Sequence, residues 1–185
     1  MSEKDNIRSV AIGSDHGAWG QKEGLKRYLE TAGYRVVDVG CTAGEKADYP
    51  DIAIEVCRRV VGGDCERGII LDGAGIGSCM AANKIKGIRA ALCYDIRTVI
   101  NSREHNNANV LTLGGPLHDA GQLADMARTW LQIRVELLGG GGIGFYLVQW
   151  IQINEMRAVG AAFIAIAVVV VALDYVSAKI RERLA

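Results

Sequence analysis

The stretch that decides the fold is I-I-L-D-G-A-G-I-G-S, residues 69–78. Its apolar start predicts a short buried strand, Gly68–Leu71, and its glycines stand between that strand and a segment of helical spacing. Glycine allows close backbone approach, and a helix N-terminus is electropositive, so such a turn is suited to holding an anion on N–H groups. Taken alone, the G-x-G-x-G pattern is weak and fits a tight turn without a ligand equally well.

The same alternation of apolar runs and helical spacing extends along the chain in both directions. The predicted strands are Ser9–Ile12, Arg35–Val39, Gly68–Leu71, Ala90–Cys93 and Val110–Leu113. The predicted helices are Trp19–Thr31, Ile52–Val61, Ser78–Lys84, Ile96–Glu104 and Asp119–Leu131. This order predicts an α/β fold: a Rossmann-like, open, parallel five-stranded sheet with flanking helices, which binds ligands at the carboxyl ends of its strands.

Polar residues stand where that architecture places ligands. The first strand leads into G-S-D-H-G, residues 13–17, the third ends at Asp72, and R-E-H-N-N, residues 103–107, precedes the fifth. Each segment also has an ordinary structural interpretation. A histidine near a helix end is often only a favourable cation there, and Asp15-His16 can cap the next helix.

Composition favours a small ligand. Lys plus Arg and Asp plus Glu both number 21, so no overall positive field attracts nucleic acid. The five cysteines are scattered without a metal-site or disulfide pattern, which indicates a reducing compartment. The polar start MSEKDNIRSV is unlike a secretory signal, so we expect a cytoplasmic protein.

A second region follows a change of composition after Glu136. We predict two parts: residues 1–136, and residues 137–185 with a glycine-rich junction and an apolar helical tail. The apolar run 158–173 would rise about 24 Å as a helix, short of the roughly 30 Å of a bilayer core. Three interpretations stay open: a marginal membrane anchor through 158–176, a helix that packs against protein, or a fused reading frame.

The longest motifs resemble one enzyme family. I-I-L-D-G-A-G-I-G-S-C-M-A-A-N-K-I-K-G-I-R-A-A-L-C, then R-E-H-N-N-A-N-V-L-T-L-G-G, G-S-D-H-G and Asp48-Tyr49-Pro50 together cover roughly residues 7–134. They resemble type B ribose-5-phosphate isomerases and the related galactose-6-phosphate isomerases. The resemblance implies a homodimer or homotetramer with active sites built from two chains, a sugar phosphate as substrate, and no metal or other cofactor.

The resemblance also implies roles for individual residues. In these enzymes a base moves a proton between C1 and C2 through an enediolate. His105 would open the sugar ring, and Asn106 would hold the enediolate oxygen. The residues expected to bind substrate are Asp15, His16 and Tyr49, for hydroxyls or phosphate, and Gly73, Gly75 and Gly77, whose loop amides stabilise the enediolate.

The chain departs from the family at the position of the base. Asp72 stands where the family commonly has a cysteine base, and Ser78 stands where other members have a glutamate. We therefore expect Asp72 to be a replacement base with a pKa raised by desolvation, so that Asp72→Asn abolishes turnover with little change in melting temperature.

Other departures concern substrate handling and phosphate. Ala74 replaces a threonine, Pro116 replaces an arginine after the fifth strand, and the family's C-terminal arginines are missing. These losses motivate an alternative function, a catalytically inactive sugar-phosphate-binding or scaffolding protein of the same fold. From about Leu137 the chain instead resembles the last segment of phosphonate-type ABC transporter permeases.

Overall fold

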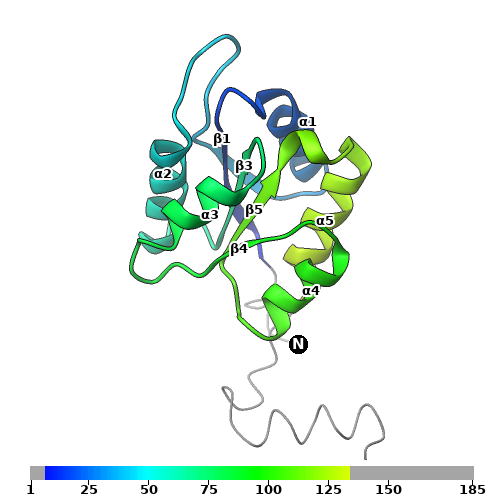
Figure 1. Cartoon of the computed structure of the whole chain (residues 1–185). Helices are drawn as coiled ribbons and strands as arrows, with labels where there is room; N and C mark the ends of the chain where they lie inside the picture. The colour runs from blue at the N-terminus through cyan, green and yellow to red at the C-terminus, as the bar shows by residue number, and fades with distance from the viewer. Residues whose placement is uncertain (1–6, 134–185) are drawn as a thin grey trace, which may run out of the picture. The chain divides into compact units, whose positions relative to one another are not determined.

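The structure of the protein is a computed structural model that describes residues 7–133. Strands and helices alternate along this part of the chain (Figure 1). In order, they are β1 (Ser9–Ser14), α1 (Trp19–Thr31), β2 (Arg35–Asp38), α2 (Tyr49–Val61), β3 (Arg67–Asp72), α3 (Ile76–Ala82), β4 (Ala90–Leu92), α4 (Ile96–Glu104), β5 (Val110–Gly114), the 3-10 helix η2 (Gly115–Leu117) and α5 (Ala120–Gln132).

The five strands form one sheet in the order β2-β1-β3-β5-β4, and every neighbouring pair is parallel. This confirms the predicted open parallel sheet. Strand β3 lies at the centre, and its register places Leu71 opposite Ser14 of β1 and Asp72 opposite Gly114 of β5. The ends of three adjacent strands therefore meet at one edge, where ligands of such sheets bind.

Helices cover both faces of the sheet. On one side α1, α4 and α5 pack around a core that contains Val10, Ile12 and Trp130, and on the other α2 and α3 pack around Ala11 and Ile70. Figure 1 shows the two groups on opposite sides of the strands. Successive residues of a strand point to opposite faces, so a continuous apolar run serves both cores.

Two helices begin earlier than predicted, and both differences bear on the strand-end edge. Helix α2 begins at Tyr49 rather than Ile52, because Pro50 is accepted in the first turn of a helix. Helix α3 begins at Ile76 rather than Ser78, directly after Gly75, whose φ of 77° favours glycine. The glycine loop is therefore shorter than the sequence predicted.

Several predictions lie outside the described residues. They are the apolar tail 137–185, the candidate span 158–176 and the permease resemblance. Within residues 7–133, no helix is both long and apolar enough to cross a membrane. The boundary at residue 136 and the cytoplasmic location stay predictions.

A buried lysine ties α1 to β2 and the segment after it. Lys22 is 1% exposed, and its Nζ donates to both carboxylate oxygens of Asp38, at 3.0 and 2.8 Å, and to the carbonyl of Cys41 at 3.0 Å. Lys26 also binds Asp38, but its side chain is 28% exposed. The two lysines share one partner and differ chiefly in burial.

We expect Lys22→Met to lower the free energy of unfolding by about 3 kcal/mol, because it removes the buried partner of Asp38. Lys26→Met, the matched control, should cost less than about 1 kcal/mol, because water screens its ion pair. Urea unfolding of both variants measures the difference. Equal losses would contradict the assignment of Lys22 as the anchor.

Candidate active site

Asp72 ends the central strand, and its carboxylate is surrounded by the glycine loop that comes next in the chain. One oxygen, Oδ1, accepts from the N–H groups of Ala74, at 2.8 Å, and Gly75. The other, Oδ2, accepts from the N–H of Ser78 at 3.0 Å and from its hydroxyl at 2.5 Å. Four donors therefore hold a side chain that is 5% exposed, and the loop closes around it.

The expected rise in the pKa of Asp72 is wrong. Burial alone would raise it, but the hydrogen bonds from the Ser78 hydroxyl and from the N–H groups of Ser78, Gly75 and Ala74 outweigh burial and lower the pKa below its ordinary value. A carboxylate stabilised in this way has little tendency to take a proton. These contacts argue against Asp72 as the base and give Ser78 a role that its position alone did not indicate.

Asp15 and His16 follow β1 and lie beside this loop. Asp15 Oδ1 accepts from the N–H of Gly17 at 3.0 Å. Nδ1 of His16 lies 3.1 Å from the carbonyl of Ala47, and since a carbonyl only accepts, this nitrogen donates. Burial raises the pKa of the Asp15 carboxyl, and the charge of Asp72 raises it further, against the opposing effects of Gly17, His16 and Ala18.

Tyr49 completes this cluster from the N-terminus of α2. A Cβ added at Gly77 would lie 2.7 Å from Cε2 of the Tyr49 ring, so the ring rests directly on the glycine loop. A Cβ at Gly75 would lie 2.6 Å from a methyl carbon of Leu92. Both glycines are therefore required by close packing. The structure brings together Asp15, His16, Tyr49, Asp72, Gly73, Gly75 and Gly77 at the carboxyl edge of the sheet.

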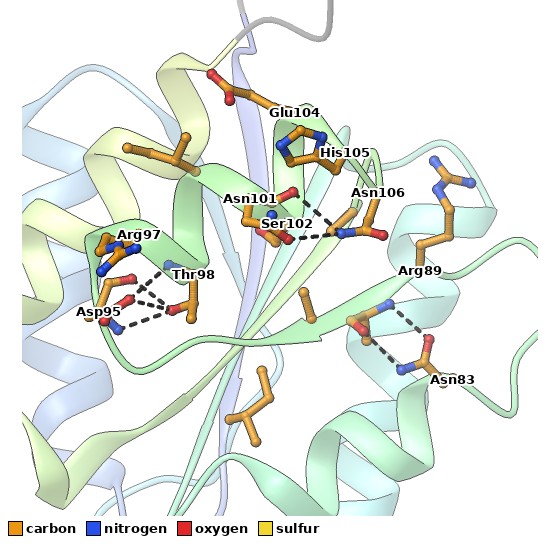
Figure 2. A pocket seen from close by; sticks show the side chains of 15 residues that line it. Asn83, Arg89, Asp95, Arg97, Thr98, Asn101, Ser102, Glu104, His105 and Asn106 are labelled. Carbon is orange, nitrogen blue, oxygen red and sulfur yellow. Dashed lines mark hydrogen bonds between the residues drawn. The ribbon is translucent and has the colours of Figure 1, made fainter. Parts of the chain in front are cut away.

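His105 and Asn106 lie in a different place. They stand at the end of α4 and line an open groove of about 1050 Å³ along β4, an edge strand of the sheet (Figure 2). Asn106 Nδ2 lies 3.4 Å from the carbonyl oxygen and 3.3 Å from the side-chain oxygen of Asn101. None of the residues of the strand-end cluster lines this groove. Within one chain, the predicted site residues thus form two separate groups.

Arg103 fixes the turn that carries His105 and Asn106, and sequence reasoning did not assign it this role. It is 2% exposed, and its Nη1 donates to Asn107 Oδ1 at 3.1 Å and to the carbonyl of Ala108. Its guanidinium lies 5.5 Å from the centre of the Trp130 ring. Burial, with the nearby charges of Arg67 and Arg89, lowers the pKa of Arg103 to about 10.

One signal in the sequence pointed toward Arg103. The polar segment R-E-H-N-N stands between a helix and a buried strand, where a turn must pack against the core. Asn107 has a φ of 45°, in the left-handed region that asparagine tolerates better than most residues. Which side chain turns inward to hold such a turn depends on α5, far along the chain.

Among residues 7–133, no group of three or more His, Cys, Asp or Glu side chains is placed to hold a metal ion. The strand-end cluster itself offers carboxylates, N–H groups and an aromatic ring. Its two carboxylates, Asp15 and Asp72, have environments that shift their pKa values in opposite directions. Such pairs are typical of sites that transfer protons.

Comparison with known proteins identifies the class that this fold and these loops define. Residues 10–142 match the Ribose/Galactose Isomerase family, so the chain belongs to that family. The putative sugar phosphate isomerase YwlF of Bacillus subtilis is 39% identical over 132 residues, covering 71% of this chain and 87% of that protein. The D-erythrulose-4-phosphate isomerase of Pectobacterium atrosepticum is 37% identical over 145 residues, covering 75% and 94%.

Solved structures that resemble this chain belong to the same class of enzyme. Ribose-5-phosphate isomerase B of Clostridium thermocellum is 38% identical, with a TM-score of 0.68 over 80% of this chain and 98% of that chain. The enzyme of Thermotoga maritima is 37% identical, with a TM-score of 0.69 over 77% and 95%. These matches confirm the isomerase resemblance. They do not show the permease resemblance of the segment after residue 137.

Asp72→Asn should destabilise the protein, because an amide nitrogen cannot accept the hydrogen bonds that the carboxylate accepts. We expect a loss of about 1–3 kcal/mol at pH 7. Since folding lowers the pKa of Asp72, its stabilising effect is complete above the unfolded value near 3.8 and is lost as pH falls through the lower folded value. Thermal unfolding from pH 7 to pH 3 should show the deficit shrinking below about pH 4.

The control for this prediction is Asp125→Asn, which removes an exposed carboxylate paired with Arg128. It should change stability by less than about 1 kcal/mol. A deficit in Asp72→Asn no larger than in this control would contradict the role of Asp72 in holding the loop.

Proposed function

We propose that this protein interconverts an aldose phosphate and its ketose phosphate by moving a proton between C1 and C2 through an enediolate. The observation that carries the proposal is family membership over residues 10–142, joined with a fold that assembles Asp15, His16, Tyr49 and the glycine loop at the carboxyl edge of the sheet. The relatives' names refer to four-, five- and six-carbon sugar phosphates, namely erythrulose 4-phosphate, ribose 5-phosphate and galactose 6-phosphate. We take a sugar phosphate of this range as the substrate.

The two groups of residues have separate tasks in this reaction. His105 opens the ring by proton transfer, and Asn106 donates to the enediolate oxygen. The N–H groups of Ala74, Gly75 and Ser78 are directed at Asp72. Of the three glycines, Gly73 and Gly77 are not among these donors, and we take their amides as the ones that face substrate, while Gly75 contributes through the shape of the turn.

We infer that a second copy of the chain completes each active site. The support is geometric, because His105 and Asn106 line the groove along edge strand β4, whereas Asp15, His16 and Tyr49 gather around the glycine loop. A homodimer that places one chain's groove over the other chain's loop would unite the two groups, and a homotetramer would be two such dimers. The groove also carries Arg89 and Arg97, whose guanidinium groups would suit a phosphate.

Turnover is the first test of the proposal. Purified protein should form ketose from at least one of ribose 5-phosphate, erythrose 4-phosphate and galactose 6-phosphate, as measured by a coupled assay or by proton NMR. His105→Gln should lower kcat on the cyclic substrate about a hundred- to ten-thousand-fold. Calorimetric binding of these sugars without turnover would support the catalytically inactive alternative instead.

Subunit complementation tests the shared site. Asp15→Asn and His105→Gln proteins should each be nearly inactive, but mixing them under conditions of subunit exchange should restore activity. For random pairing in a two-fold dimer, half of the dimers are hybrids with one intact site in two, so about a quarter of wild-type activity should return. If the mixture stays inactive although mass spectrometry shows hybrids, the site lies within one chain.

A further inference from the structure

We propose that Asp15 is the general base that moves the proton between C1 and C2, and that Asp72 holds the glycine loop in shape. This inference rests on the isomerase function proposed above. It moves the role of base from Asp72, where sequence reasoning placed it, to a neighbouring carboxylate, and it does so from the hydrogen bonds at the ends of β1 and β3.

The first step is that Asp72 is fully engaged. Its two oxygens accept from three backbone N–H groups and one hydroxyl, all from the glycine loop and the first turn of α3, and the side chain is 5% exposed. To take a proton from carbon, an oxygen would have to give up these donors and leave their N–H groups unpaired. The Ser78 hydroxyl, which donates at 2.5 Å, occupies the same Oδ2 that would otherwise be available.

The second step is that Asp15 is close by and less engaged. Register pairs Ser14 with Leu71, so Asp15 follows β1 at the level where Asp72 ends β3. Its Oδ1 accepts from the N–H of Gly17 at 3.0 Å, and the N–H of Ala18 also acts on the carboxylate, so Asp15 has two donors where Asp72 has four. The titratable groups that act on it are Asp72 and His16, and burial with the charge of Asp72 raises its pKa. A half-buried carboxylate of this kind is a better proton acceptor than Asp72.

The third step compares the remaining candidates at this edge. His16 is exposed and donates through Nδ1 to Ala47, in the segment before α2. Cys79 lies on α3, and its Sγ is within 3.5 Å of the carbonyl of Ala90. Asp15 thus combines a less engaged carboxylate with a position beside the glycine loop. His16 offers a second ring nitrogen, Nε2, and the experiment includes this residue for that reason.

The chemistry balances without any further reactant. The Asp15 carboxylate takes the C2 proton of the open-chain aldose, the C–H electrons form the C1–C2 double bond, and the carbonyl electrons move to O1. The enediolate oxygen then receives the proton of the C2 hydroxyl. As the C2 carbonyl forms, the Asp15 carboxyl returns its proton to C1, which regenerates the carboxylate and releases the ketose.

The experiment compares Asp15→Asn, His16→Gln and Asp72→Asn on a sugar phosphate that the wild-type protein turns over. Readouts are kcat, KM, melting temperature and deuterium uptake from solvent into C1 and C2. We expect Asp15→Asn to lose about a hundred- to ten-thousand-fold in kcat, with KM changed only a few-fold and deuterium uptake lost in parallel. Asp72→Asn should melt earlier while its folded fraction still exchanges deuterium.

Chemical rescue separates a base from a residue that only binds a hydroxyl. Formate or acetate should restore part of the kcat of Asp15→Ala, with the stronger base giving more rescue, and should not restore Asp72→Ala. A retained kcat in Asp15→Asn, a loss confined to KM, or a loss of exchange only in His16→Gln or Asp72→Asn would overturn the assignment and leave the isomerase function standing. Wild-type protein that turns over no sugar phosphate would overturn both.

Discussion

The hydrogen bonds that converge on Asp72 are the constraint on which the strand-end edge depends. A carboxylate at the end of a central strand is removed from water, so its charge must be compensated by nearby donors. The loop supplies them by folding back, which aligns Ala74, Gly75 and Ser78 around the side chain. That curvature starts α3 at Ile76 and brings Gly77 against Tyr49. The shape of the loop therefore depends on one buried charge.

The same constraint separates the properties of two neighbouring carboxylates. Asp72 has four donors and a lowered pKa, whereas Asp15 accepts from the backbone of Gly17, faces the charge of Asp72 and has a raised pKa. Two acids at the ends of adjacent strands thus become chemically unlike, because the loops after them supply different numbers of donors. A negative charge on Asp72 at neutral pH also favours the protonated form of its neighbour, which helps Asp15 to accept a proton.

The sheet was predictable because its signals are local: five apolar runs, glycine punctuation and helical spacing between them. The direction of the pKa shift of Asp72 was not predictable, because desolvation and hydrogen bonding shift the pKa of a carboxyl in opposite directions. Which effect is larger depends on interatomic distances, which the spacing of residues in the sequence does not give. Ser78 was noted as a missing glutamate, and only its contact with Asp72 shows what the hydroxyl does. Likewise, Arg103 stood in a polar segment, and its burial against Trp130 depends on α5.

Arg103 also explains why His105 and Asn106 are positioned before any ligand arrives. A buried guanidinium is unfavourable unless its donors are used. Nη1 of Arg103 donates to Asn107 and Ala108, within the turn itself, whereas its Nε is buried without a hydrogen-bond partner among the described residues. Asn107 adds a left-handed backbone conformation that only a well-packed surrounding maintains. Since the turn is held from inside the domain, it can present His105 and Asn106 rigidly at the β4 groove. Rigid placement matters for the roles proposed for these residues, because proton transfer and enediolate stabilisation both depend on geometry that is set in advance.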